Sequence, residues 1–299
     1  MPKAPTGPRR SPGRLPAAFA GLALILAPWC HAATILFVGN SFTYGELSPV
    51  RYFQPESVID LNHEGTGGVP ALFKEFTAEA KLSYEVSLET SPAKNLDYHL
   101  EQKASVLDRP WDYVVLQGYS TLDQHKPGDP AVLVQYAGRL SRLFQAKNPR
   151  VDIRLVSTWS RADQTYLPTG HWFGKPIDAM ANEIRAAYDL AAATSPAIRS
   201  VIPVGQAWNR AIAIHLAAPN PYEPGTGRGI DLWGPDHYHG STYGYYLEAL
   251  VIFGNLTGRD PRTLGAGEQA AIALGIEPSL ATTLQKVAAD TLAAESRRH

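Results

Sequence analysis

The sequence predicts a single α/β domain built on a parallel sheet. Short apolar runs rich in β-branched residues recur along the chain, as at 113–116. Segments of ten or more residues with helical spacing of apolar side chains separate these runs. This alternation is typical of βαβ units, which give a parallel sheet with right-handed crossovers. The chain has 299 residues, 44% hydrophobic and 18% charged, which suffices for one large core.

Residues 1–32 are predicted to be a secretory signal peptide. Basic residues begin the segment, 15–28 is an apolar run too short to span a membrane comfortably, and Cys30-His31-Ala32 offers a cleavage site after Ala32. The alternative is an uncleaved N-terminal anchor. Cleavage would remove Cys30, the only cysteine, and with it any disulfide. We therefore expect a secreted or periplasmic protein, without stable membrane insertion, whose domain covers 33–299.

The expected elements alternate regularly along this domain. Strands are expected at 34–38, 57–61, 84–88, 113–116, 151–156 and 201–204. Helices are expected at 69–80, 96–106, 130–146, 177–193, 207–217 and 239–256, followed by two closing helices. No linker or internal repeat interrupts the pattern, which indicates one domain. Loops 157–176 and 219–235 are longer than such connections need to be, and long loops often carry function.

Polar residues and glycines follow several of the expected strands. Ser41 comes directly after Gly39-Asn40 at the end of the first strand, and Gly67 and Gly68 follow the second. The carboxyl ends of parallel strands meet at one edge of the sheet, where α/β proteins bind their ligands. Ser41 is thus a candidate nucleophile, although a serine here could also simply cap a helix.

Asp236 and His239 complete a possible catalytic set before the last long helix. Three residues apart, they can lie on one side of a turn. Ester hydrolysis needs a nucleophile, a base, a group that orients the base and donors for the oxyanion. Ser41, His239 and Asp236 would fill the first three roles, with oxyanion donors from the backbone of Ser41 and of a glycine. A plain helix start and a His-x-His zinc site are the alternatives.

These blocks, in this order, resemble the SGNH/GDSL hydrolase superfamily. Gly39-Asn40-Ser41 is similar to its first block, Gly68 to its second, and Asp236-His237-Tyr238-His239 to its last. The resemblance implies a three-layer α/β/α sandwich with a five-stranded parallel sheet. It also implies an esterase with a Ser41-His239-Asp236 triad that needs neither a metal nor an organic cofactor. It does not fix the substrate.

The third block departs from the superfamily pattern. Gly-x-Asn-Asp is expected there, and its Asn donates to the oxyanion, but this chain has Gln117-Gly118-Tyr119-Ser120. We expect the oxyanion hole to comprise the backbone of Ser41 and Gly68 and the amide of Gln117, with Ser120 as the second candidate. A missing donor typically costs on the order of a hundredfold in rate.

Tryptophans near the same sheet edge suggest the kind of ester. Trp159, Trp172, Trp208 and Trp233 lie in or beside loops that follow strands. They could form an aromatic cleft for sugars, lined by Gly67, Ser120, Trp159 and Trp208, although each tryptophan alone is also a core candidate. We expect a small-molecule or polysaccharide acyl ester as substrate. A net charge of −1 gives no case for nucleic acid. A glycan-binding module with a weakened site is the alternative function.

Overall fold

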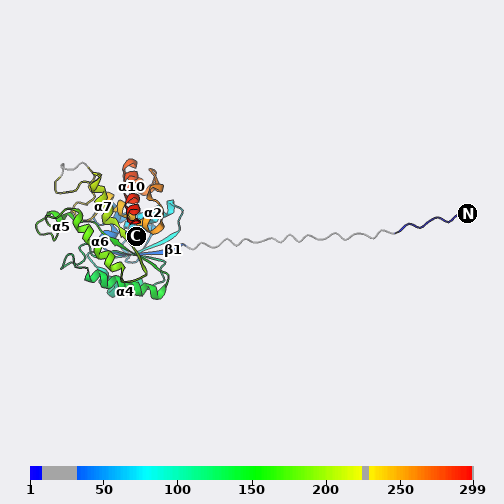
Figure 1. Cartoon of the computed structure of the whole chain (residues 1–299), viewed down its shortest axis with the longest axis horizontal. Helices are drawn as coiled ribbons and strands as arrows, with labels where there is room; N and C mark the ends of the chain where they lie inside the picture. The colour runs from blue at the N-terminus through cyan, green and yellow to red at the C-terminus, as the bar shows by residue number, and fades with distance from the viewer. Residues whose placement is uncertain (9–31, 224–228, 298–299) are drawn as a thin grey trace. The chain divides into compact units, whose positions relative to one another are not determined.

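The computed structural model describes residues 1–8, 32–223 and 229–297. Most of the expected signal peptide, including Cys30, lies outside these residues. Residues 1–31 and 32–299 form separate units, and the fold is that of the second (Figure 1). Within the described ranges no helix is long and apolar enough to cross a membrane.

A six-stranded parallel sheet forms the centre of the domain, in the order β2-β3-β1-β4-β5-β6. The strands are β1 (Ala33–Gly39), β2 (Ile59–Asp60), β3 (Tyr84–Thr90), β4 (Tyr113–Leu116), β5 (Asp152–Ser157) and β6 (Ile198–Pro203). Every neighbouring pair is parallel.

The sheet thus has one strand more than the five that the superfamily resemblance implied. The sixth is the edge strand β2, which pairs with β3 at only two positions. It ends early because the Asp60 carboxylate accepts hydrogen bonds from the backbone N–H groups of Asn62, Glu64 and Thr66. These bonds turn the chain away from the sheet.

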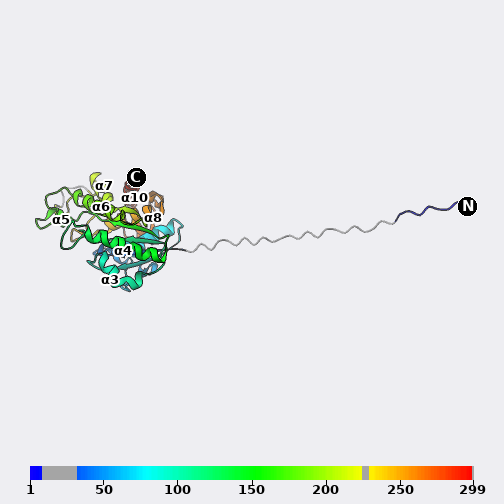
Figure 2. The same cartoon turned by 60° about the horizontal axis from the view of Figure 1, so that its bottom comes forward.

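Helices cover both faces, which confirms the expected three-layer sandwich (Figures 1 and 2). The α-helices are α1 (Ser41–Tyr44), α2 (Gly68–Glu79), α3 (Leu96–Leu107), α4 (Ala131–Lys147), α5 (Ala162–Tyr166), α6 (Asp178–Ala192), α7 (Val204–Ala213), α8 (Thr242–Thr257), α9 (Gln269–Ala273) and α10 (Pro278–Glu295). Three short 3₁₀ turns are η1 (Pro49–Tyr52), η2 (Pro55–Ser57) and η3 (Pro261–Leu264).

Strand β1 divides the hydrophobic core into two halves. Ile35 and Phe37 point into the half formed with α2, α8 and α10, while Leu36 and Val38 point into the half formed with α3, α4 and α6. This alternation follows from the two-residue period of a strand. Both faces of β1 are buried, as its continuous apolar run predicts. β1 is therefore central, and its carboxyl end holds Ser41 at the middle of the sheet edge.

Helix α8 begins three residues later than the sequence pattern suggests. Ser241 caps it by accepting a hydrogen bond from the Gly244 N–H at 3.3 Å. Asp236 and His239 consequently lie in the loop before the helix rather than in its first turn.

Candidate active site

Asn40 fixes the turn that presents Ser41. Its Oδ1 accepts from the Phe42 N–H at 3.2 Å, and its Nδ2 donates to the carbonyl oxygens of Lys94 at 2.9 Å and Gly118 at 3.1 Å. One side chain thus ties the end of β1 to the loops after β3 and β4. Ser41 is half-buried at the start of α1. Among the described residues, neither its hydroxyl nor its N–H has a hydrogen-bond partner.

Gln117 lies beneath the same turn. Its Oε1 accepts from the Asn40 N–H and from the Thr43 hydroxyl, both at 3.1 Å, and its Nε2 donates to the Gly118 carbonyl. The residue is 1% exposed. This placement gives the amide a supporting role under Ser41, and its expected role as an oxyanion donor has no geometric support.

The two glycines of the second block have different surroundings. The Gly67 N–H donates to the Arg51 carbonyl at 2.9 Å. No acceptor in the described part of the chain takes the Gly68 N–H. Gly68 has φ +65°, and a Cβ there would lie 2.8 Å from the Tyr44 Cα and 2.9 Å from the Thr43 carbonyl oxygen. The start of α2 therefore packs directly on α1, where only glycine fits.

Asp236 and His239 form a hydrogen-bonded pair. His239 Nδ1 lies 2.6 Å from Asp236 Oδ2, and the N–H groups of Tyr238 and His239 donate to Oδ1 at 3.2 and 3.0 Å. Burial alone would raise the pKa of Asp236, but these hydrogen bonds outweigh it and hold the pKa below its usual value. An ionised carboxylate only accepts, so Nδ1 carries the imidazole proton and Nε2 presents a lone pair.

The fold brings the first and last blocks together. The rings of Phe42 and His239 lie 5.4 Å apart, and the Tyr245 hydroxyl of α8 donates to the Ser41 carbonyl at 3.2 Å. His239 is 3% exposed, and its Nε2 has no hydrogen-bond partner in the described residues. A hydrogen bond between Nε2 and the Ser41 hydroxyl stays a prediction, because such bonds are often long in unliganded enzymes.

Arg161 is a site residue that the sequence reasoning missed. Its Nη1 donates to the Ser120 hydroxyl at 3.2 Å, and its guanidinium lies 4.1 Å from the centre of the Tyr238 ring. Nε and Nη2 donate to the Asp163 carboxylate at 3.0 and 2.7 Å. Arg161 thus joins the third block to the loop that carries Asp236 and His239. The unusual length of loop 157–176 was the only signal for it in the sequence.

The tryptophans do not line a cleft, so that expectation is wrong. Trp159 and Trp208 are 0% and 1% exposed and stack with ring centres 4.3 Å apart, while Trp172 and Trp233 are also buried. Trp159 packs on Phe42 at 4.6 Å and donates from Nε1 to the Tyr238 carbonyl at 3.0 Å. These rings fill the space beneath α1 and the His239 loop and so support the site from below.

Within the described residues, no group of three or more His, Cys, Asp or Glu side chains is placed to hold a metal ion. His237, the other histidine of the proposed His-x-His pair, packs its ring on Tyr222 at 4.5 Å. Ser41, His239 and Asp236 are residue types that can act in acyl transfer, and the Asp236–His239 pair is hydrogen-bonded.

The comparisons with solved structures agree with this architecture. A DUF4886 family protein from Bacteroides uniformis matches with a TM-score of 0.60 and 17% identity, over 88% of this chain and 95% of that one. A protein described as a GDSL-like lipase from Parabacteroides merdae matches with a TM-score of 0.51 and 15% identity, over 76% and 96%. No protein-family model and no curated protein matches the chain. The chain has the SGNH hydrolase fold.

Proposed function

We propose that the protein is a serine esterase that hydrolyses carboxylic esters through Ser41, His239 and Asp236. The observation that carries this proposal is the Asp236–His239 pair, whose unpartnered Nε2 lies in the same aromatic cluster as Phe42, the neighbour of Ser41. Such a pair is the base and its orienting acid in serine hydrolases on several unrelated folds.

The reaction begins with proton transfer from the Ser41 hydroxyl to His239 Nε2 as Oγ attacks the ester carbonyl. The tetrahedral intermediate collapses, the ester C–O bond breaks, and the alcohol leaves with the proton from His239. Water then attacks the acyl-enzyme and loses a proton to His239. The bond between the acyl carbon and Ser41 Oγ breaks, His239 returns the proton to Oγ, and the carboxylic acid is released. Asp236 stays ionised and stabilises the imidazolium that forms in each half of the reaction.

We assign the oxyanion hole to the N–H groups of Ser41 and Gly68 and to the Ser120 hydroxyl. Both N–H groups lack acceptors in the described residues, and α2 packs Gly68 against α1. The Ser120 oxygen accepts from Arg161, which leaves its own proton available for a second acceptor. Ser120 therefore replaces the Asn of the superfamily pattern better than Gln117, whose amide is already bonded to Asn40, Thr43 and Gly118.

Export is part of the proposal. The first strand begins at Ala33, directly after the expected cleavage site. The core would then be complete without residues 1–32.

Hydrolysis of p-nitrophenyl acetate by the purified protein tests the esterase function. Ser41→Ala should lower kcat/KM on the order of 10³-fold or more, because it removes the nucleophile. Ser279→Ala, at an exposed position on α10, is the matched control and should keep full activity. Circular dichroism of both variants checks that the fold is retained.

Equal and negligible turnover by the wild type and Ser41→Ala would contradict the esterase proposal. If both proteins then bound a glycan, the binding-module alternative would take its place.

A further inference from the structure

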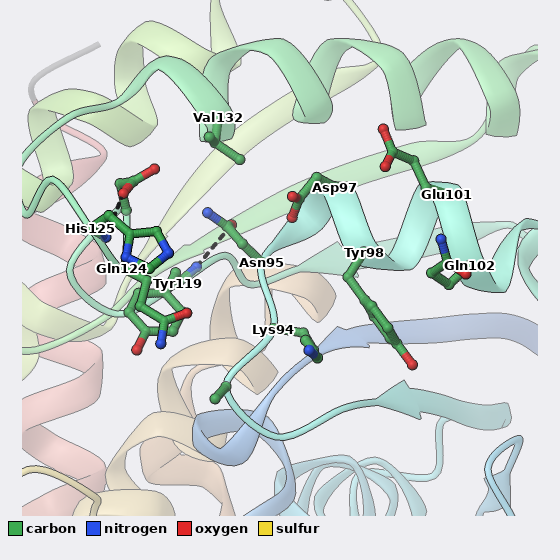
Figure 3. Close-up of a pocket in the computed structure, with 12 residues that line it drawn as sticks. Lys94, Asn95, Asp97, Tyr98, Glu101, Gln102, Tyr119, Gln124, His125 and Val132 are labelled. Carbon is green, nitrogen blue, oxygen red and sulfur yellow. Dashed lines mark hydrogen bonds between the residues drawn. The ribbon is translucent and has the colours of Figure 1, made fainter.

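A polar pocket of about 310 Å³ lies between the start of α3 and the loop after β4 (Figure 3). One wall comes from the segment that leads into and begins α3, namely Ala93, Lys94, Asn95, Asp97, Tyr98, Glu101 and Gln102. The other comes from the loop after β4, namely Tyr119, Asp123, Gln124 and His125. Val132 at the start of α4 closes one end. Ligand pockets span about 300–1,000 Å³, so this volume suits a small ligand.

A hydrogen bond connects the lining of the pocket to the turn that holds Ser41. Lys94, which lines the pocket, accepts a hydrogen bond through its carbonyl from Nδ2 of Asn40, the residue before Ser41. Asn95 Oδ1 accepts from the Tyr119 N–H at 3.0 Å, and Tyr119 directly precedes the proposed oxyanion donor Ser120. These two hydrogen bonds thus connect the lining of the pocket to the residues that precede Ser41 and Ser120.

Two tyrosine rings and several hydrogen-bonding side chains line the pocket. Tyr98 and Tyr119 are half-buried, and each offers an aromatic surface next to polar groups. Asp97 on α3 and Gln124 and His125 on the opposite loop supply acceptors and donors across the space (Figure 3). Aromatic rings that bind the C–H faces of a ligand, with carboxylates and amides that accept from its hydroxyls, suit a sugar ring better than a hydrocarbon chain.

The charge of the lining narrows the class of ligand further. Three carboxylates belong to it, those of Asp97, Glu101 and Asp123, against Lys94 as the one permanently charged cation among the lining residues. The Lys94 ammonium lies 5.1 Å from the centre of the Tyr98 ring. Arg139 pairs with Glu101 at 3.6 Å, which leaves Asp97 and Asp123 against Lys94. This smaller excess of negative charge still disfavours a phosphate or carboxylate on the ligand.

We propose that this pocket binds the alcohol portion of the substrate and that this portion is a neutral sugar ring. The inference rests on the proposed esterase function, because it places the ester of that sugar at Ser41. A carbohydrate substrate was first inferred from tryptophans that are in fact buried. The lining of this pocket is an independent argument for the same class of substrate.

The kinetic test compares three acetate esters on the full chain. They are ethyl acetate, whose alcohol is too small to stack on the pocket's rings, an O-acetylated methyl glucoside, and the matching O-acetylated methyl glucuronoside. The wild type should prefer the neutral sugar ester to the anionic one. Tyr98→Ala should lower kcat/KM for the acetylated glucoside about tenfold through loss of the stacking surface, and should lower it less for ethyl acetate, whose alcohol has no ring to stack on Tyr98. Tyr98→Phe, which keeps the ring, is the matched control and should retain activity on both.

A second measurement separates failure of this inference from failure of the esterase function. Calorimetric titration of the Ser41→Ala variant with the acetylated glucoside reads binding without turnover. If Ser41→Ala binds the acetylated glucoside and the double variant Ser41→Ala, Tyr98→Ala does not, the pocket is supported. This result holds whatever the rate on p-nitrophenyl acetate. The inference is overturned if Tyr98→Ala leaves glucoside binding and turnover unchanged, if it lowers the rates on both esters equally, or if the glucuronoside is preferred.

Discussion

At the residue scale, the proposed chemistry depends on which polar atoms of the site have no hydrogen-bond partner within the protein. Gln117, Asn40 and Asp236 are each committed to two or more hydrogen bonds within the protein. His239 Nε2 and the Ser41 hydroxyl have no partner in the described residues. A buried nitrogen without a hydrogen-bond partner lowers the stability of the folded state. In the proposed reaction this nitrogen accepts the Ser41 proton.

Asp236→Asn tests the orienting role. The Asn amide would donate toward His239 rather than accept from it, so the proton would move to Nε2 and the base would be lost. We expect kcat on p-nitrophenyl acetate to fall by about 10²–10⁴-fold. Asp231→Asn is the control in the same loop. The Asp231 side chain accepts from the Trp233 N–H and its carbonyl accepts from the Ser241 hydroxyl, and an Asn can keep both bonds, so kcat should hardly change. A full rate in Asp236→Asn would rule out the triad as assigned.

The low pKa of Asp236 also decides the pH dependence. Since its pKa is held below the usual value, Asp236 stays ionised as the pH rises from the acid range through neutrality. A profile of kcat/KM against pH should therefore show no limb from Asp236 in the weakly acid range.

Ser120→Ala tests the revised oxyanion hole. Loss of one donor should lower kcat about 10²-fold with little change in KM, because the donor acts on the charge of the transition state. Arg161→Gln, which removes the guanidinium that positions the Ser120 hydroxyl, should give a smaller fall in kcat. Ser141→Ala removes a buried hydroxyl on α4 that bonds only to Ala137, and it serves as the control. If Gln117 were the donor instead, Ser120→Ala would keep its rate.

At the element scale, the contact between α1 and α2 holds Ser41 in place. Gly68→Ala should destabilise the protein by more than Gly65→Ala, although both residues have positive φ, +65° and +69°. A Cβ at position 65 meets nothing within 4 Å, so its cost is the backbone strain alone, about 1 kcal/mol. A Cβ at position 68 would also push on Tyr44 and Thr43 and so displace the helix that carries Ser41.

Urea unfolding and kcat measure the two effects of this pair of variants. Only Gly68→Ala should lower kcat on p-nitrophenyl acetate. Equal stability and equal rates in the two variants would mean that the α1–α2 contact does not position Ser41.

The sequence predicted most elements, because their patterns are local. All six apolar runs are strands, and the six expected helices lie within a few residues of α2, α3, α4, α6, α7 and α8. Side-chain direction at the strand ends was not predictable. The Gln117 amide turns under the chain because Asn40 and Thr43 supply donors there, 77 and 74 residues away in sequence. Likewise, nothing in loop 157–176 shows that Trp159 points inward while Arg161 reaches Ser120.

At the scale of the whole molecule, a buried acid in α8 should shape the stability of the fold. Glu248 is 1% exposed, and its Oε2 has no hydrogen-bond partner in the described residues. Burial holds the pKa of this carboxyl well above its usual range. The folded protein thus retains a proton that the unfolded chain releases above about pH 4.3.

The sign of the resulting pH dependence follows from proton binding. Above that pH the unfolded chain binds fewer protons, so the free energy of unfolding falls with rising pH, by about 1.4 kcal/mol per pH unit, until the folded pKa is reached. Glu248→Gln removes this term and should raise the thermal midpoint more at pH 8 than at pH 5. Glu85→Gln, at an exposed position on β3, should leave the pH profile unchanged. A wild-type profile that Glu248→Gln does not alter would contradict the buried-acid account.

The stacked pair beneath the active site has an optical consequence. Trp159 and Trp208 are nearly parallel, 2° apart, with ring centres 4.3 Å apart, so the electronic transitions of the two indoles are coupled. Trp159 also touches Phe42 and bonds to the Tyr238 carbonyl, so any shift of α1 or of the His239 loop changes the coupling. The protein thereby carries a built-in spectroscopic reporter, through which substrate arrival at Ser41 could be followed in real time without a label.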